Sequence, residues 1–340
     1  MVDQVPRAMS RMQVLGHRWR VGALDGRLPS EPASIRSAAW AGLQDSMPRA
    51  AVLSLHARIE NTGPDDWAHP ELVQVWGPRH SVFAVPAEDV AAFTLGRLPA
   101  AGAARRRAEE TADRLERFLA GRRMTYRAAG EGLGVHPNSL RYAAATGRVL
   151  LRWEGSGQPV VWTVDPPGVP EREARLELAR RFLHVLGPGT VTGFSKWAGV
   201  TQKEADATMA ALEDELVTVR TPVGVGQMLA DDVAAAGEVD PPATVRLLPS
   251  GDAYYLRWGA DRGLLVPDAR RRSDLWTARV WPGAMLVDGE IVGTWRRSER
   301  RVDLNPWHRL SADQRGAIEV EAASLPIPGE GRITAHWSEA

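Results

Sequence analysis

The sequence contains no cysteine, very little lysine and no long run of apolar residues. The absence of cysteine excludes disulfides, thiol nucleophiles and cysteine-ligated zinc. No apolar stretch approaches the ~18 residues that a membrane span needs, and the first 34 residues lack the apolar core of a secretion signal. We therefore expect a cytoplasmic protein without a membrane segment.

The remaining composition is that of a globular protein. The chain has 340 residues, of which 44% are hydrophobic and 25% are charged. At about 100 to 200 residues per domain, this length predicts two or three domains, each large enough to bury its own core. Disorder of the whole chain is excluded.

The positive charge is almost entirely arginine, because Lys196 and Lys203 are the only lysines. Nine arginines fall in residues 97–127 and ten in residues 257–301, whereas residues 203–240 hold two basic and nine acidic residues. A protein with one cationic face for nucleic acid shows this kind of asymmetry. Arginine used in place of lysine on solvated faces gives the same composition, so charge alone leaves both interpretations open.

The first hundred residues predict helices followed by a small hairpin. Helical patterns with caps or turn residues at their ends cover residues 11–24, 35–43 and 51–59. Short apolar runs, separated by Gly77 and Pro78, then predict strands at residues 73–75 and 81–85.

The middle of the chain gives a sharper signal, which occurs twice. Its first copy predicts a long helix, a short helix, a turn, a second helix and a hairpin, at residues 103–121, 125–133, 137–146 and 149–164. This is the winged-helix order, in which the second helix of the pair enters the major groove of DNA. The second copy predicts helices at residues 171–186 and 192–198, a third helix opened by a capping box at Thr201 and Glu204, and a strand at residues 216–221.

After residue 241 the pattern changes to short apolar runs punctuated by glycine, proline and aspartate. Asp288 and Gly289 form a hairpin-turn signal within this region. The runs predict strands at residues 245–248, 254–258, 263–266, 279–281, 285–287, 291–296 and 332–337. We expect a separate β domain here.

At this point the residues resemble a known family, the winged-helix DNA glycosylases of the AlkZ and YcaQ type, which excise alkylated and crosslinked bases. The match is carried by four stretches in family order, at residues 19–26, 42–44, 79–89 and 286–296. The resemblance implies an α+β fold with three tandem winged-helix modules and a C-terminal β-barrel-like domain around a cationic DNA channel. The corresponding boundaries are 1–100, 101–168, 169–240 and 241–340. It also implies a monomer that acts on duplex DNA, alkylated or crosslinked, without a cofactor.

The catalytic signature of that family is only partly present. Its active members place Gln-x-Gln or Gln-x-Asp directly after Gly-Leu, whereas this chain has Gln44, Asp45 and Ser46. The family also tends to show Arg-Gly-Thr-x-His in the first hairpin, where this chain has Arg79 followed by His80, so the imidazole lies three places earlier. Serine cannot act as a base unaided, and Asp45 replaces the missing group only if the segment is a loop, because adjacent side chains diverge on a helix. Gln44 is either catalytic or a helix-end residue.

Several residues are candidates for DNA contact. Arg79 and His80 of the first hairpin are two of them, and each of the others has a structural alternative. On the predicted recognition helix these are Asn138, which also suits a helix cap, Arg141 and Tyr142. The arginine clusters at 270–272 and 296–297 suit phosphates but also fit a solvated face, and comprise Arg270, Arg271, Arg272, Arg296 and Arg297. Tryptophans on the predicted strands, such as Trp258, are interpreted as core. The histidines lack metal-site spacing, so no metal is predicted.

The sequence therefore predicts a duplex-DNA-binding protein related to glycosylases that excise alkylated or crosslinked bases. The alternative is a non-catalytic DNA-binding protein that kept the scaffold and lost the catalytic pair. Sequence alone leaves the enzymatic activity undecided between them.

Overall fold

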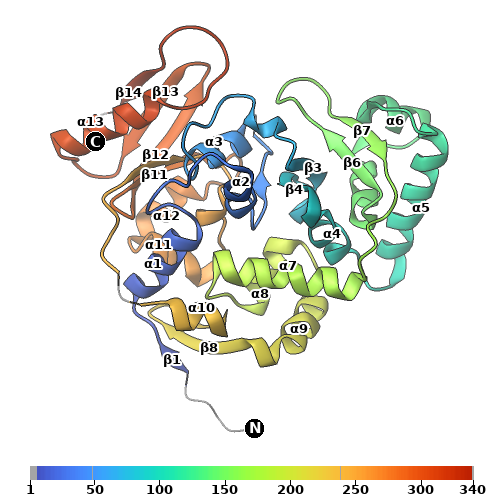
Figure 1. The fold of residues 1–340 in the computed structure, drawn as a ribbon, viewed down its shortest axis with the longest axis horizontal. Coiled ribbons are helices and arrows are strands. Elements are labelled where there is room, and N and C mark those ends of the chain that lie inside the picture. Colours follow the sequence, from blue (N-terminus) through green and yellow to red (C-terminus); the bar gives the residue numbers. More distant parts are fainter. Residues whose placement is uncertain (1–5, 48, 238, 339–340) are drawn as a thin grey trace.

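The computed structural model describes residues 6–47, 49–237 and 239–338. Residues 1–5, at the start of the stretch examined above for a targeting signal, lie outside the described residues. Helices and strands are mixed along the chain, and the described strands form three sheets (Figure 1).

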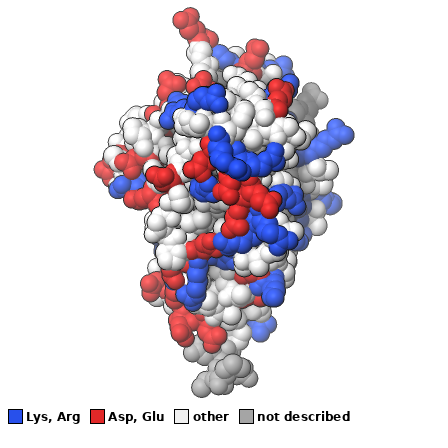
Figure 2. All heavy atoms as spheres, turned by 90° about the vertical axis from the view of Figure 1, so that its right-hand side faces the viewer, with Lys and Arg blue, Asp and Glu red and all other residues white. Residues whose placement is uncertain are grey.

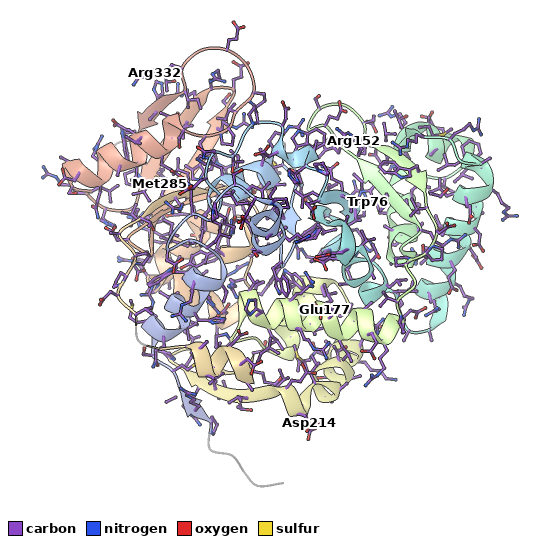
Figure 3. The ribbon with its side chains drawn as sticks, in the orientation of Figure 1. Trp76, Arg152, Glu177, Asp214, Met285 and Arg332 are labelled. Carbon is purple, nitrogen blue, oxygen red and sulfur yellow. The ribbon has the colours of Figure 1, made fainter. Side chains whose placement is uncertain are left out.

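The largest sheet has six strands and joins parts of the chain that the sequence assigns to two separate modules. Its spatial order is β2 (Leu43–Gln44), β4 (Val82–Pro86), β3 (Leu72–Trp76), β6 (Val149–Arg152), β7 (Val160–Thr163) and β5 (Met124–Thr125). The link between the two halves is the antiparallel pairing of β3 with β6, in which Gln74 lies opposite Leu151. Figure 3 shows Trp76 of β3 and Arg152 of β6 in the region where the halves meet.

The predicted helices of the first hundred residues are present but shorter than expected. They are α1 (Arg11–Val21), α2 (Pro32–Ala38) and α3 (Ala50–His56), with the short α4 (Val90–Phe93) after β4. Ser10 and Gln13 cap α1 reciprocally, which satisfies backbone N–H groups at its start. The helix stops before residue 24 because Gly22 caps its end and Ala23 has a left-handed backbone.

The region that follows matches the predicted element order. It contains α5 (Gly102–Leu119), α6 (Tyr126–Gly132) and η5 (Pro137–Thr146), and then the hairpin of β6 and β7. The helix expected at 137–146 is a 3₁₀ helix rather than an α-helix. Its start is fixed by the His136 imidazole, which accepts a hydrogen bond from the Asn138 backbone N–H.

The second copy of this order is also confirmed. Its elements are α7 (Glu171–Leu186), α8 (Val191–Ala198), α9 (Gln202–Ala211), β8 (Leu216–Thr221) and β9 (Gly224–Leu229), followed by α10 (Ala230–Ala235). The capping box predicted for Thr201 and Glu204 opens α9. β1 (Arg7–Ala8) adds to this hairpin in parallel with β8. Residues 7 and 8 therefore join residues 169–240 and not the rest of the first hundred residues.

The C-terminal region is an open five-stranded sheet, not a barrel. The order is β10 (Val245–Leu248), β11 (Gly283–Val287), β12 (Glu290–Ser298), β13 (Arg301–Pro306) and β14 (Thr334–Trp337). Among the described strands, β10 and β14 are the edge strands, and each pairs on one side. The last helix, α13 (Ala312–Ala323), contacts both edge strands. Asp288 and Gly289, both with positive φ, make the predicted turn between β11 and β12.

Three strands predicted in this region are wrong. Residues 254–258 lie in and after the 3₁₀ turn η7 (Ala253–Tyr255), residues 263–266 fall mostly in α11 (Arg262–Leu265), and residues 279–281 belong to no strand. Most of the apolar side chains in the first two stretches are buried without a sheet partner, and a short apolar run does not distinguish a strand from a buried helical turn. The Asp252 carboxylate favours the turn, because it accepts a hydrogen bond from the Tyr254 N–H.

The N-terminal helices and the C-terminal region form a common core. The Trp19 indole N–H donates to the Tyr254 hydroxyl at 2.9 Å. Arg58 and Asp252 form a two-pronged ion pair, with both bonds at 2.7 Å and both side chains buried. These contacts fix the first hundred residues against the last hundred.

Candidate functional site

The segment Gln44, Asp45 and Ser46 leaves the sheet at the end of β2 and is not helical. The Asp45 N–H still donates to the Val82 carbonyl at 2.8 Å, so the backbone remains beside β4. Side chains alternate along an extended chain. Accordingly, Asp45 is completely buried, whereas Gln44 is half-buried and Ser46 is exposed.

Asp45 faces the protein interior and both of its carboxylate oxygens are occupied. One accepts from the Ala51 N–H at 3.0 Å, in the first turn of α3, and the other accepts from the Gln74 amide at 3.0 Å. Burial raises the pKa of Asp45 to about 6, although these hydrogen bonds and the charge of Arg49 act to lower it. The carboxylate therefore joins the loop to α3 and to β3.

Gln44 is held by Arg79, whose guanidinium donates to the Gln44 Oε1 at 2.6 Å. The same guanidinium donates to the Trp197 carbonyl at 2.7 Å and lies 5.2 Å from the centre of the Trp258 ring. Burial lowers the pKa of Arg79 to about 10, which still leaves it charged at neutral pH. On the opposite side is Gly251, with φ +81°, where a Cβ would lie 2.9 Å from the Gln44 Nε2. The Gln44 amide therefore lies between the Arg79 guanidinium and the backbone of Gly251.

The turn that carries Arg79 and His80 is strained. Both residues have left-handed backbones, with φ values of 56° and 57°. Non-glycine residues in this region cost about 1 to 3 kcal/mol each, and such strain is most often found at functional sites. A hydrogen bond from the Gly77 N–H to the Ser81 carbonyl at 2.9 Å closes the turn. This backbone conformation places Arg79 against Gln44 and His80 at a neighbouring cleft.

That cleft has a volume of about 350 Å³ and brings together residues from both halves of the large sheet. Ser46 and His80 come from the first hundred residues and Arg141 from η5, and the remaining lining residues are Trp76, Ser81, Val82, Tyr126, Trp153, Gly157, Gln158 and Pro159. We call it the Ser46 cleft. It contains one member of the predicted catalytic segment and two of the predicted DNA-contact residues.

His80 is held as a neutral imidazole. Its pKa is lowered to about 4, first by burial and then by the charges of Arg97 and Arg141, although the Arg141 backbone acts in the opposite direction. The ring meets the Tyr142 ring edge-on, at 5.1 Å between centres. Its Nδ1 is buried and has no hydrogen-bond partner among the described residues.

The other candidates on η5 are at the surface. Asn138 is exposed, and the capping role considered for it belongs to His136. Tyr142 is 38% exposed, and the Arg107 guanidinium stacks on its ring at 4.6 Å. Arg141 lines the Ser46 cleft described above, and Asn138 and Tyr142 lie on the exposed surface of η5.

The arginine clusters are placed differently from each other. On α12 (Ala269–Leu275), Arg270 is exposed and pairs with Asp268, whereas Arg271 and Arg272 donate to backbone carbonyls. Arg296 and Arg297 line a smaller cleft of about 160 Å³. That cleft also contains Met47, one residue after Ser46, and the exposed Val280. Only the second cluster therefore lies next to the candidate catalytic segment.

Acidic side chains lie among the arginines of residues 97–127. Arg105 pairs with Glu171 at 2.7 Å, whereas Asp113, on the same helix α5, pairs at 2.6 Å with Arg148 from outside this stretch. Figure 2, which views the molecule from the side of α5, shows positive and negative side chains interleaved over this face. Segregation of charge along the sequence does not give a uniformly cationic surface there.

Two residues of the site were missed by the sequence analysis. Gln74 donates to Asp45 and exchanges two hydrogen bonds with the backbone of Trp153, at 2.6 and 3.2 Å. Arg49 donates to the Glu154 carbonyl and stacks on Trp67 at 4.1 Å. A glutamine between valines of a buried strand is the one signal that pointed to Gln74. Together the two side chains attach the β6–β7 hairpin to the candidate catalytic loop.

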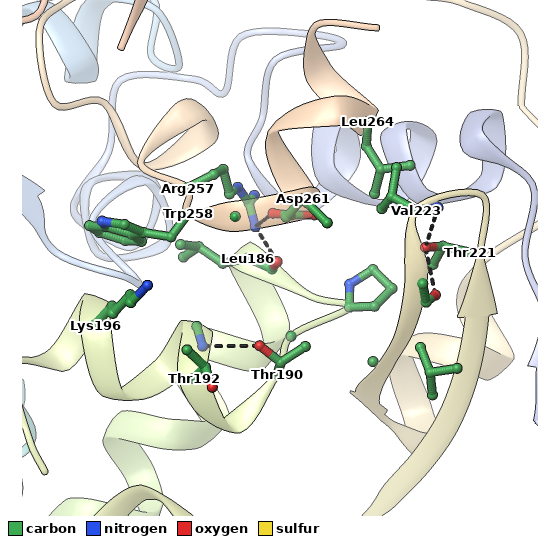
Figure 4. A pocket seen from close by; sticks show the side chains of 18 of the residues that line it. Leu186, Thr190, Thr192, Lys196, Thr221, Val223, Arg257, Trp258, Asp261 and Leu264 are labelled. Carbon is green, nitrogen blue, oxygen red and sulfur yellow. Dashed lines mark hydrogen bonds and ion pairs between the residues drawn. The ribbon is translucent and has the colours of Figure 1, made fainter. Parts of the chain in front are cut away.

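A third pocket, of about 250 Å³, lies between α8 and the β8–β9 hairpin (Figure 4). Lys196 of α8 and Trp258 line it at one end, and the tip of the β8–β9 hairpin lines it at the other. Trp258, predicted as a core residue on a strand, is partly buried against the core that contains Phe182 but lies outside the strands.

No group of three or more His, Asp or Glu side chains able to hold a metal occurs in the described part of the chain. None of the described helices is long and apolar enough to cross a membrane.

Comparison with known proteins identifies the family. The family model described as DNA glycosylase AlkZ-like matches residues 38–326, so the chain belongs to the AlkZ-like DNA glycosylase family and the resemblance is confirmed. It is similar to the interstrand DNA cross-link repair glycosylase of Streptomyces sahachiroi, with 26% identity over 158 residues. That match spans 45% of this chain and 42% of the relative. The solved structure of the Streptomyces sahachiroi DNA glycosylase AlkZ has the same fold, with a TM-score of 0.77 at 17% identity, over 97% of this chain and 100% of that one.

Proposed function

We propose that this protein binds duplex DNA across the Ser46 cleft and hydrolyses the bond between an alkylated or crosslinked base and its sugar. The observation that carries the proposal is the cleft itself. The end of the family's catalytic segment, at Ser46, lines it together with a candidate DNA-contact residue, Arg141, from a different part of the chain.

The DNA-binding part of the proposal rests on element order. We interpret residues 1–100, 101–168 and 169–240 as three winged-helix modules, with η5 and α9 as the second helices of their pairs. The exposed Asn138 and Tyr142 are then base-edge or backbone contacts, and Arg141, Arg296 and Arg297 are phosphate contacts. Action as a monomer, in the cytoplasm and on the nucleoid when bound, stays a prediction.

The chemistry asks little of the protein. A base alkylated on a ring nitrogen is cationic and leaves readily, so the protein must orient a water molecule and stabilise positive charge on the sugar. Arg79 occupies the Gln44 Oε1, so Gln44 offers its amide N–H groups to water or to the sugar. Gln44 therefore suits the orientation of the nucleophile rather than proton transfer.

A base-release assay tests this function. A duplex with a single N7-methylguanine, incubated with excess protein, should lose the base faster than the same duplex alone, and an undamaged duplex should stay intact. The Gln44→Ala variant should retain duplex affinity and lose ~10²-fold or more in release rate, because orientation acts on the barrier and not on phosphate binding. Equal release with and without protein contradicts the proposal.

A non-catalytic DNA-binding protein is the second candidate, and the surroundings of Asp45 favour it. The only carboxylate of the segment is buried with both oxygens engaged, and its neighbour Ser46 cannot act as a base unaided. This candidate predicts salt-dependent binding of duplex DNA with no base release from any alkylated substrate. The release assay distinguishes the two.

A further inference from the structure

We propose that His80 is the proton acceptor for the attacking water, in place of the second catalytic group that Ser46 lacks. This inference rests on the proposed hydrolysis and adds to it a residue outside the family's catalytic segment.

The fold brings His80 and Ser46 to the same cleft. β2 and β4 pair Leu43 with Ala84 and Gln44 with Phe83, and the Asp45 N–H bond to Val82 continues that pairing. Ser46 follows this pairing, and His80 lies in the turn before β4. Both residues line the Ser46 cleft, whose volume of about 350 Å³ leaves room for a water molecule.

The other residues of the Ser46 cleft cannot take the role. The titratable groups among its lining residues are His80, Tyr126 and Arg141. A tyrosine hydroxyl and an arginine guanidinium act as donors and are poor acceptors for a further proton. Asp45 lies behind the loop, with its oxygens occupied. His80 is therefore the lining residue whose neutral side chain can take up a proton.

The surroundings keep the imidazole of His80 neutral, so that it can accept a proton. The charged groups that face the ring are Arg97 and Arg141, and the neutral Tyr142 packs against it. Their charges and burial lower the pKa of His80 to about 4, similar to an ordinary aspartate at about 3.9. The imidazole thus has the proton affinity of the carboxylate used by Gln-x-Asp members, but carries no negative charge near the phosphates.

The step is balanced without a cofactor. The water oxygen forms a bond to C1′ of the deoxyribose, and the bond from C1′ to the base nitrogen breaks. The electron pair of that bond neutralises the cationic base as it leaves. One water proton passes to the imidazole of His80 and is later released to solvent, which leaves an abasic sugar with a hydroxyl at C1′.

The test compares His80→Asn with the wild-type protein in single-turnover release of N7-methylguanine. Asparagine tolerates a left-handed backbone, so the turn at residue 80 is preserved. We expect ~10²-fold to 10⁴-fold slower release with duplex affinity unchanged, and His80→Ala should show the same loss. His308→Asn, which changes an exposed histidine outside the three pockets, is the matched control and should behave as wild type.

The pH profile separates a proton acceptor from a packing residue. Wild-type release should fall as the pH drops through about 4 to 5, because the protonated imidazole cannot accept a proton. The His80→Asn variant should lack this step, and adding Ser46→Asp to it should restore at least tenfold of the rate.

Two results overturn the inference while leaving the proposed function intact. One is release by His80→Asn within about threefold of wild type, and the other is a slow variant that keeps the acid step. Absence of release by the wild-type protein, with duplex binding retained, overturns the proposed hydrolysis and this inference together.

Discussion

Asp45 is a carboxylate that the fold keeps away from water, and replacing it with asparagine should change how stability depends on pH. The rise of its pKa from 3.8 to about 6 corresponds to ~3 kcal/mol. Because the folded-state pKa lies above the unfolded value, this stability is fully present below about pH 4 and is lost as the pH rises through about 6. About 2 kcal/mol of it should disappear between about pH 4.5 and pH 8.

Asp45→Asn removes this loss but has a constant cost. The carboxylate accepts hydrogen bonds on both oxygens, whereas an amide has only one oxygen, so one partner of the pair Ala51 and Gln74 loses its acceptor. That cost is about 1 to 3 kcal/mol and does not depend on pH. The stability of the variant relative to wild type should therefore improve by ~2 kcal/mol from about pH 4.5 to pH 8.

Urea unfolding of both proteins at four or five pH values in this range measures the difference. The matched control is Asp165→Asn, an exposed aspartate, for which the difference should be flat. A flat difference for Asp45→Asn as well would refute the reasoning. The same variant should change base release by less than about tenfold, whereas loss of a general base costs ~10²-fold or more.

Three further outcomes follow from other contacts. Arg58→Ala leaves Asp252 as a buried, unpaired charge and should lower the free energy of unfolding by about 3 to 5 kcal/mol, measured by urea titration at neutral pH. Gly251→Ala places a Cβ against the Gln44 amide and a side chain at a positive φ, so base release should fall with duplex affinity unchanged, as measured by single-turnover rates beside binding isotherms. Duplex affinity should fall ~10³-fold to 10⁵-fold between about 50 and 200 mM salt, and Arg141→Ala should reduce the slope by about 1; a flat dependence would exclude the phosphate-contact interpretation.

Local signals in the sequence predicted local structure well. The capping box at Thr201 and the Asp288 and Gly289 turn lie where expected, because each depends on a few neighbouring residues. The strand expected at residues 254–258 failed for the complementary reason. Tyr254 and Tyr255 are buried by α1 and the C-terminal core, and composition reports burial without reporting backbone shape.

The candidate site was predictable only in part. The family motif located Gln44, but nothing in the sequence tells that Arg79 reaches it or that Asp45 points inward. Both facts depend on contacts between residues 35 to 41 positions apart, which the pairing of β2 with β4 brings together. The link of Gln74 to Trp153 spans 79 positions and joins two modules that the pattern treats as independent. Such contacts are set by tertiary packing and leave no periodic trace.

The sheet shared by the first two modules also limits how the chain can be divided. Trp76 is 1% exposed and packs in the same core cluster as Leu115, Leu140 and Leu151, which all belong to the second module. A fragment ending at residue 100 would uncover the Trp76 ring. It would also remove β6 from the side of β3, which would become an open edge available to other chains. We expect such a fragment to aggregate, whereas a fragment comprising residues 6–168 keeps both the edge and the ring covered.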